Sequence, residues 1–163
     1  MWYNIKVMSE NNKSKKTVHH VLAHSYLLYF IALILGLILD FIYPLSFSIA
    51  SFFTYAGLVF VIAGSILVIW AQRSSGHLRR KKEEVHHTDF KKGPYFFIRT
   101  PTQLGLSFLV FGYGLLANSF FISIGAILAH TVSQLVFIPR AERFLEESYG
   151  EHYLHYKKTV KRI

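Results

Sequence analysis

The sequence contains no cysteine and is poor in acidic residues, with 9 Asp+Glu against 18 Lys+Arg in 163 residues. Without cysteine, disulfide bonds and thiolate metal ligands are excluded. A glycine-rich phosphate loop is also missing, since Gly112-Tyr113-Gly114 lies inside an apolar run with no strand before it. No serine is accompanied by an obvious paired base. These absences remove several common classes of catalytic site.

What is abundant is apolar: 52% of the residues are hydrophobic. The cationic residues are gathered in three blocks between long apolar runs, whereas a soluble basic domain would spread them along its length. This pattern indicates a polytopic membrane protein and not a nucleic-acid-binding protein.

Four apolar segments predict an all-α membrane domain with four transmembrane helices, because each is near the ~20 residues that cross a bilayer. They run approximately over Tyr26–Tyr43, Phe47–Ala71, Pro101–Ala117 and Phe120–Ile138. The expected single domain, 1–163, comprises two helical hairpins (26–71 and 101–138). Three polar segments flank them: 1–25, a loop over 72–100, and the tail 139–163. The first apolar segment is interpreted as a retained anchor, and Met8 is an alternative start.

The short connections Pro44-Leu45-Ser46 and Asn118-Ser119 carry no Lys or Arg. The N-terminal segment carries four cationic residues, the central loop eight and the tail six. By the positive-inside rule, we expect both termini and the central loop to be cytoplasmic. The expected location is a prokaryotic plasma membrane.

In the tail, apolar residues recur every three or four positions, which predicts an amphipathic cytoplasmic helix at the membrane interface or under the bundle. The stripe consists of Leu145, Tyr149, Tyr153, Tyr156, Val160 and Ile163. Gly150 interrupts this run and is expected to separate two short helices.

Several polar groups in the sequence allow two interpretations. The run Arg79-Arg80-Lys81-Lys82 is typical of a topology determinant, and it could also attract an anionic cofactor or lipid. His20 and His24 have a spacing that suits a metal, but no carboxylate accompanies them, so no metal site is expected. His130, inside the fourth apolar segment, either lines a cavity or makes a hydrogen bond in packing.

The segment Gly93–Gly105 joins the cationic loop to an apolar run, where irregular polar backbone is tolerated only inside protein or along a cavity. The second hairpin returns Arg140–Arg143 to the same membrane face as Arg99–Gln103. We therefore expect a small concave site between them. Arg99 would grip an anion and Glu142 would accept an ammonium group, a combination that suits a zwitterionic, amino-acid-like cofactor.

From about Trp70 onward, the spacing of several residues matches a known pattern. These are Gly93-Pro94-Tyr95, Arg99, Pro101, Gly105, Glu142, Leu145, Tyr149-Gly150, Tyr153 and Tyr156. With them the chain resembles the integral-membrane methyltransferases related to isoprenylcysteine carboxyl methyltransferase and phospholipid methyltransferase. The same C-terminal architecture occurs in membrane sterol reductases that use a nicotinamide cofactor.

The resemblance implies methyl transfer from S-adenosylmethionine to a lipophilic acceptor embedded in the membrane, either isoprenylcysteine carboxylate-like or phospholipid-like. The residues expected to contact the cofactor are Tyr95, Arg99, Thr100, Gln103, Leu104 and Glu142. Arg140 and Arg143 are expected to hold an anionic acceptor, and no residue is assigned a catalytic role.

Three positions depart from that pattern. Thr100 stands where the family has His, Gln103 where it has Tyr, and Ala141 where it has the first of two Glu. Because Ala141 removes a carboxylate, a non-catalytic protein that retains the fold is one alternative function. A nicotinamide-dependent lipid reductase is the other.

Overall fold

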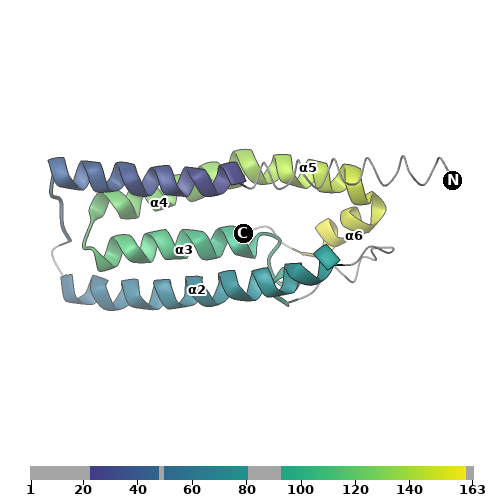
Figure 1. Ribbon diagram of the computed structural model, residues 1–163, viewed down its shortest axis with the longest axis horizontal. Coiled ribbons are helices and arrows are strands. Elements are labelled where there is room, and N and C mark those ends of the chain that lie inside the picture. Colours follow the sequence, from purple (N-terminus) through teal and green to yellow (C-terminus); the bar gives the residue numbers. More distant parts are fainter. Residues whose placement is uncertain (1–22, 48–49, 81–92, 161–163) are drawn as a thin grey trace.

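The computed structural model describes residues 23–47, 50–80 and 93–160. Within these ranges the chain is helical apart from short connections and has no strand, as the sequence predicts. The helices lie along a common direction in an elongated bundle (Figure 1). The first runs over Ala23–Ile42. The others are α2 (Ala50–Arg80), the 3₁₀ turn η2 (Gly93–Phe96), α3 (Pro101–Leu116), α4 (Phe120–Val132), the π-helical η3 (Ser133–Phe137), α5 (Ile138–Tyr149) and α6 (Glu151–Thr159).

Three helices in the described part of the chain are long and apolar enough to cross a membrane. They are Ala23–Ile42, Ser51–Ser75 within α2, and Phe120–Glu147, which runs from α4 into α5. The remaining apolar helix, α3, has 16 residues, or about 24 Å, which is less than the ~30 Å of a hydrocarbon core. The sequence-based expectation of four spans is thus supported for three helices.

Two glycine pairs hold α2 and α3 side by side (Figure 1). A Cβ added to Gly57 would lie 2.7 Å from the carbonyl oxygen of Gly112, and one added to Gly64 would lie 2.7 Å from that of Gly105. The two pairs are seven residues apart in each helix, so they fall on one face and let the backbones meet. Gly105 and Gly112 thus serve close helix packing.

The turn between α3 and α4 lies where the sequence predicts it. Asn118 adopts a positive φ of 54°, a conformation that Asn tolerates better than most residues. Ser119 follows as the N-cap of α4, and its side chain accepts a 3.2 Å hydrogen bond from the backbone N–H of Ile122. Pro101 opens α3 in its first turn, also as predicted.

Two helices continue past the ends expected for the apolar segments. The segment expected as a loop over 72–100 is helical at its start, because α2 continues to Arg80. The fourth apolar segment, expected to end at Ile138, continues as a helix into the tail, because α5 follows η3 without interruption. Pro139 lies in this continuous stretch. The π-helical turn immediately before it shifts the preceding carbonyls away from the α-helical positions with which a proline ring would clash.

The break predicted at Gly150 is present. Gly150 has a φ of +53° and ends α5, after which α6 folds back beneath it (Figure 1). Tyr153, Tyr156 and Val160 are buried in one cluster, with Leu145 and Tyr149 packed against it. The apolar stripe of the tail therefore packs on itself across the break. Ile163 lies outside the described residues.

Candidate functional site

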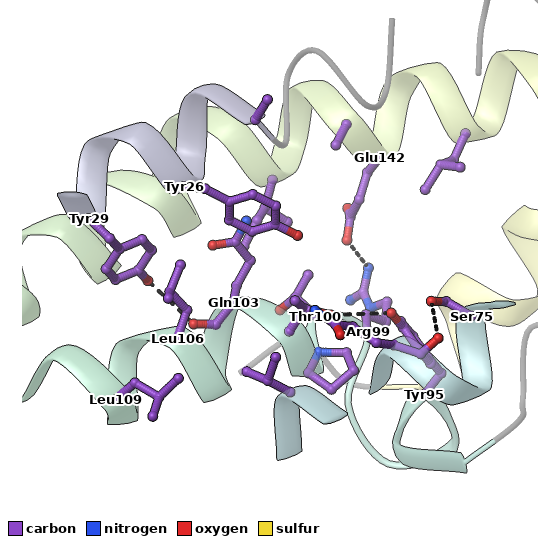
Figure 2. Close-up of a pocket in the computed structure, with 18 of the residues that line it drawn as sticks. Tyr26, Tyr29, Ser75, Tyr95, Arg99, Thr100, Gln103, Leu106, Leu109 and Glu142 are labelled. Carbon is purple, nitrogen blue, oxygen red and sulfur yellow. Dashed lines mark hydrogen bonds and ion pairs between the residues drawn. The ribbon is translucent and has the colours of Figure 1, made fainter. Parts of the chain in front are cut away.

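A cavity of about 1070 Å³ lies between the first helix, α2, the turn η2, α3, α5 and α6. At one end its walls are apolar, with Phe30 and Leu33 from the first helix and Leu106, Leu109 and Val110 from α3. At the other end they include Arg99, Thr100 and Glu142 and several tyrosines. The cavity thus joins a polar site to an apolar compartment (Figure 2).

The polar end is shaped by the turn before α3. Gly93 has a φ of +60°, and a Cβ there would clash with the Ser74 hydroxyl, so only glycine fits between this turn and α2. Tyr156 in α6 donates a 2.8 Å hydrogen bond to the carbonyl oxygen of Tyr95. The turn is therefore fixed to α2 on one side and to the tail on the other, and this places Arg99 at the cavity wall.

Arg99 and Glu142 meet across the cavity, as Figure 2 shows. The Nη1 of Arg99 donates to Oε1 of Glu142 at 2.9 Å. Glu142 is only 5% exposed, so its charge needs a partner to offset the loss of hydration. It is the one carboxylate, and Arg99 the one permanent cation, among the described residues that line the cavity.

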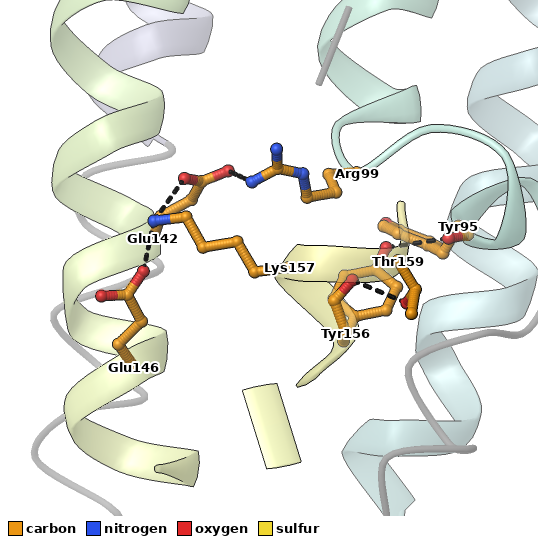
Figure 3. A network of polar contacts seen from close by, with 7 residues as sticks. All are labelled: Tyr95, Arg99, Glu142, Glu146, Tyr156, Lys157 and Thr159. Atoms are coloured by element: carbon orange, nitrogen blue, oxygen red, sulfur yellow. Dashed lines mark hydrogen bonds and ion pairs between the residues drawn. The ribbon is translucent and has the colours of Figure 1, made fainter. Parts of the chain in front are cut away.

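Lys157 contacts the same carboxylate from α6. Its Nζ lies 3.3 Å from Oε2 of Glu142 and also pairs with Glu146, one turn further along α5 (Figure 3). We refer to Arg99, Glu142, Glu146 and Lys157 as the ion cluster. Two cations face two carboxylates, so the ion cluster is neutral overall. The hydrogen bonds to the carboxylates, that to Glu146 first, raise the pKa of Lys157 and keep it charged at neutral pH.

A second polar group lies deeper in the bundle. Gln103 is 2% exposed, and its Oε1 accepts hydrogen bonds from Ser25 at 2.9 Å and from Ser133 at 3.3 Å. The two serine hydroxyls are 2.8 Å apart. Gln103 therefore ties the start of α3 to the first helix and to η3.

Three buried polar atoms at the cavity have no hydrogen-bond partner among the described residues: Nε of Arg99, Oγ1 of Thr100 and Nε2 of Gln103. Leaving such groups unpaired costs stability, which a ligand can restore by supplying the missing partners. Two of the three are obligatory donors, so oxygen or nitrogen acceptors fit best.

The tyrosines of the lining come from four elements: Tyr26, Tyr29, Tyr95, Tyr149, Tyr153 and Tyr156. Burial, followed by the nearby charge of Glu142, raises the pKa of Tyr153, and burial raises that of Tyr156. Both phenols accordingly remain protonated at neutral pH.

Of the residues predicted to contact a cofactor, Tyr95, Arg99, Thr100, Gln103 and Glu142 line the cavity. Leu104 is half-buried and does not. Arg140 and Arg143, predicted to hold the acceptor, are exposed and lie outside the lining. They neighbour Glu142 at spacings of one and two residues, and such residues point in different directions from a helix.

His130 does not line the cavity. Its Nδ1 lies 3.1 Å from the Tyr29 hydroxyl, which corresponds to the packing alternative. His24 is exposed. His20, Lys81 and Lys82 lie outside the described residues, so the interpretations of those segments stay predictions.

Sequence reasoning missed Lys157, Ser25 and Ser133. Lys157 lies outside the apolar stripe of the tail, and only the fold-back at Gly150 brings it to α5. The two serines look unremarkable in apolar runs. A usable signal was their position: both, like Gln103, lie within a few residues of the cytoplasmic end expected for their helix.

The sequence model of one family, described as phospholipid methyltransferase, matches residues 52–152. Protein-S-isoprenylcysteine O-methyltransferase B of Arabidopsis thaliana is 33% identical over 114 residues, which cover 64% of this chain and 55% of the relative. The chain thus spans about half the length of that relative. No solved structure matches the chain. Since the matched region covers more than half of the sequence and contains Arg99 and Glu142, the chain belongs to the phospholipid methyltransferase family.

Proposed function

We propose that this protein is an S-adenosylmethionine-dependent methyltransferase whose acceptor enters from the bilayer. The observation that carries the proposal is the Arg99–Glu142 pair at one end of a cavity whose other end is apolar. A zwitterionic amino-acid group can replace this pair by giving its carboxylate to Arg99 and its ammonium to Glu142. Such an exchange keeps each buried charge paired.

The remaining polar end suits the nucleoside part of the same cofactor. Tyrosine rings around the site offer surfaces on which an adenine can stack. The unpartnered donors of Arg99 and Gln103 and the hydroxyl of Thr100 can serve ring nitrogens and ribose oxygens. Thr100 and Gln103, although they differ from the family pattern, thus retain groups that can bind a cofactor.

The apolar end suits a hydrocarbon chain. Its walls are Leu, Val and Phe side chains of the two helices beside it. The whole cavity, about 1070 Å³, lies at the upper limit of the roughly 300–1,000 Å³ usual for a site that holds one small molecule. Cofactor and acceptor chain can therefore share it, with the methyl group where the two compartments meet.

When bound, S-adenosylmethionine supplies a methyl group activated by a positive sulfur, which keeps the C–S bond electrons on transfer. Arg99 and Glu142 would orient the cofactor, and the apolar walls would exclude water and align the acceptor. From the positive-inside pattern, we expect this site at the cytoplasmic face, with both termini on that side. A lipid or lipidated small molecule is the expected acceptor.

Titration of the purified protein with S-adenosylmethionine in lipid nanodiscs tests the proposal. We expect a saturable heat signal for the wild type. In Glu142→Gln the affinity should fall by at least about tenfold, because the ligand ammonium then loses the carboxylate that pairs with it in a buried site. Glu147→Gln is the matched control, since Glu147 is exposed one residue beyond Glu146. No binding by the folded wild-type protein at millimolar cofactor would refute the proposal.

The acceptor class is tested with methyl-labelled S-adenosylmethionine and two acceptors, N-acetyl-S-farnesylcysteine and phosphatidylethanolamine vesicles. Label in an organic extract identifies which class is methylated. Label in neither, with normal cofactor binding, would exclude both classes.

One observation favours a non-catalytic protein: Ala141 lines the cavity with a methyl group where the family pattern has a carboxylate. The combined change Thr100→His, Gln103→Tyr and Ala141→Glu separates the two functions. Cofactor binding that appears only in this variant supports the non-catalytic reading, whereas binding by the wild type supports the enzyme. A fluorescence change on adding reduced nicotinamide cofactor would instead support the reductase.

A further inference from the structure

Glu142, the carboxylate offered to the cofactor, has both oxygens occupied from within the chain. Oε1 accepts from Arg99 at 2.9 Å, and Oε2 lies 3.3 Å from Nζ of Lys157. Lys157 carries a primary ammonium group, which is the same chemical group as the amino end of an amino acid. The position that a ligand ammonium would take at Glu142 is therefore held by a group of matching charge and hydrogen-bonding capacity.

We propose that Lys157 is an internal competitor for the ammonium subsite at Glu142 and thereby sets the affinity of the site for ligands that carry an amino-acid group. This inference rests on the proposed function and extends it to a residue outside the cavity lining. Binding would require Nζ of Lys157 to leave Oε2 of Glu142, while α6 remains in place.

The contacts of Lys157 allow its ammonium group to move away from Glu142. Its side chain is 37% exposed, whereas that of Arg99 is 14% exposed. It already pairs with Glu146, which is itself 28% exposed and does not line the cavity. When a ligand takes Glu142, Lys157 can keep this second carboxylate, so no buried charge is left alone. Its flexible four-carbon stem allows this movement without a change in the helix.

The position of α6 beside the cavity does not depend on Lys157. Tyr156 donates a hydrogen bond to the backbone carbonyl of Tyr95 (Figure 3). Tyr153, Tyr156 and Val160 are buried together. Removing the lysine charge should therefore change the competition at Glu142 without releasing the tail.

Two adenosine ligands distinguish competition at the ammonium subsite from a general change in binding. S-Adenosylhomocysteine carries an ammonium and a carboxylate, and 5′-methylthioadenosine lacks both. We expect Lys157→Met to bind S-adenosylhomocysteine about two- to fivefold more tightly, the size expected for loss of a partly exposed ion pair. Binding of 5′-methylthioadenosine should not change. Lys158→Met, which alters the same charge at an exposed neighbouring position, should resemble wild type for both ligands.

A second variant is expected to change the affinity for S-adenosylhomocysteine in the opposite direction. Glu146→Gln removes the alternative partner, so Lys157 should remain on Glu142 and S-adenosylhomocysteine should bind about two- to fivefold more weakly. Circular dichroism would show that each variant keeps its helix content. Because the two substitutions act in opposite directions, general damage to the tail cannot produce both results.

The outcomes separate this inference from the proposed function. If neither ligand binds to the folded wild-type protein, the proposed function fails. If both bind but Lys157→Met matches Lys158→Met, or binds S-adenosylhomocysteine more weakly, the competition is refuted and the function stands. An equal gain for 5′-methylthioadenosine would show that the substitution opens the tail, which also refutes the competition.

Discussion

Gln103 connects three parts of the chain that are far apart in sequence. Its amide oxygen accepts from serines of the first helix and of η3, and Tyr29 donates to its backbone carbonyl at 3.5 Å. Ser25 and Ser133 therefore make this position suit glutamine.

Replacing Gln103 with Leu should destabilise the protein by about 1–3 kcal/mol, because buried serine hydroxyls then lose their acceptor. The triple variant Gln103→Leu, Ser25→Ala and Ser133→Ala should recover most of this loss, since no buried polar group is left unpaired. Unfolding in denaturing detergent, followed by circular dichroism, measures both. A triple variant that loses the sum of the single effects would contradict the proposed coupling.

At the scale of residues, the sequence predicts that Arg99 and Glu142 converge. In the structure, Nη1 of Arg99 lies 2.9 Å from Oε1 of Glu142. Charge and position along the chain suffice for that prediction. They do not suffice for Lys157, whose contact depends on the direction in which α6 leaves Gly150. They also misplace Arg140 and Arg143, because charge alone does not say which face of α5 turns to the cavity.

At the scale of helices, the glycine pairs bring the backbones of α2 and α3 into close contact. Gly57 meets Gly112 and Gly64 meets Gly105, each with backbone against backbone. Such contacts maximise dispersion between helices where the solvent offers no hydrophobic driving force. The pairs hold α3 in position, and with it the polar residues at its start.

Gly64→Leu should separate the two helices, because even its Cβ would lie 2.7 Å from the carbonyl oxygen of Gly105. We expect a loss of stability of about 1–3 kcal/mol or more and weaker ligand binding. Ala63→Leu, which adds the same side chain at an exposed neighbouring position, is the matched control. Equal stability of the two variants in detergent unfolding would contradict this packing.

The sequence locates these helices better than it locates their ends. Apolar length predicts α3 and α4, and Pro101 and Asn118-Ser119 mark their boundaries. Composition cannot show that a helix continues past the membrane, so the extensions of α2 to Arg80 and of α4 into α5 were missed. Glycines within the spans predict close packing, but their partners emerge only from the antiparallel alignment of two helices.

For the whole molecule, the expected orientation follows from charge alone. The absence of cysteine makes it testable with single introduced thiols. Ala117→Cys lies in the turn between α3 and α4, and Lys158→Cys in α6, and both positions are exposed. In sealed inside-out vesicles, a membrane-impermeant maleimide should label Lys158→Cys and not Ala117→Cys. Labelling of both positions, or the reverse pattern, would overturn the orientation.

The helix that carries Glu142 has a consequence for the lipid around the protein. Phe120–Glu147 forms one uninterrupted 28-residue stretch, about 42 Å long, in a hydrocarbon layer of ~30 Å. Arg99, by contrast, is attached to the short helix α3. A thicker or thinner bilayer changes helix tilt, and the long and short helices would respond by different amounts. A change in membrane thickness can therefore shift Glu142 relative to Arg99 within the ion cluster.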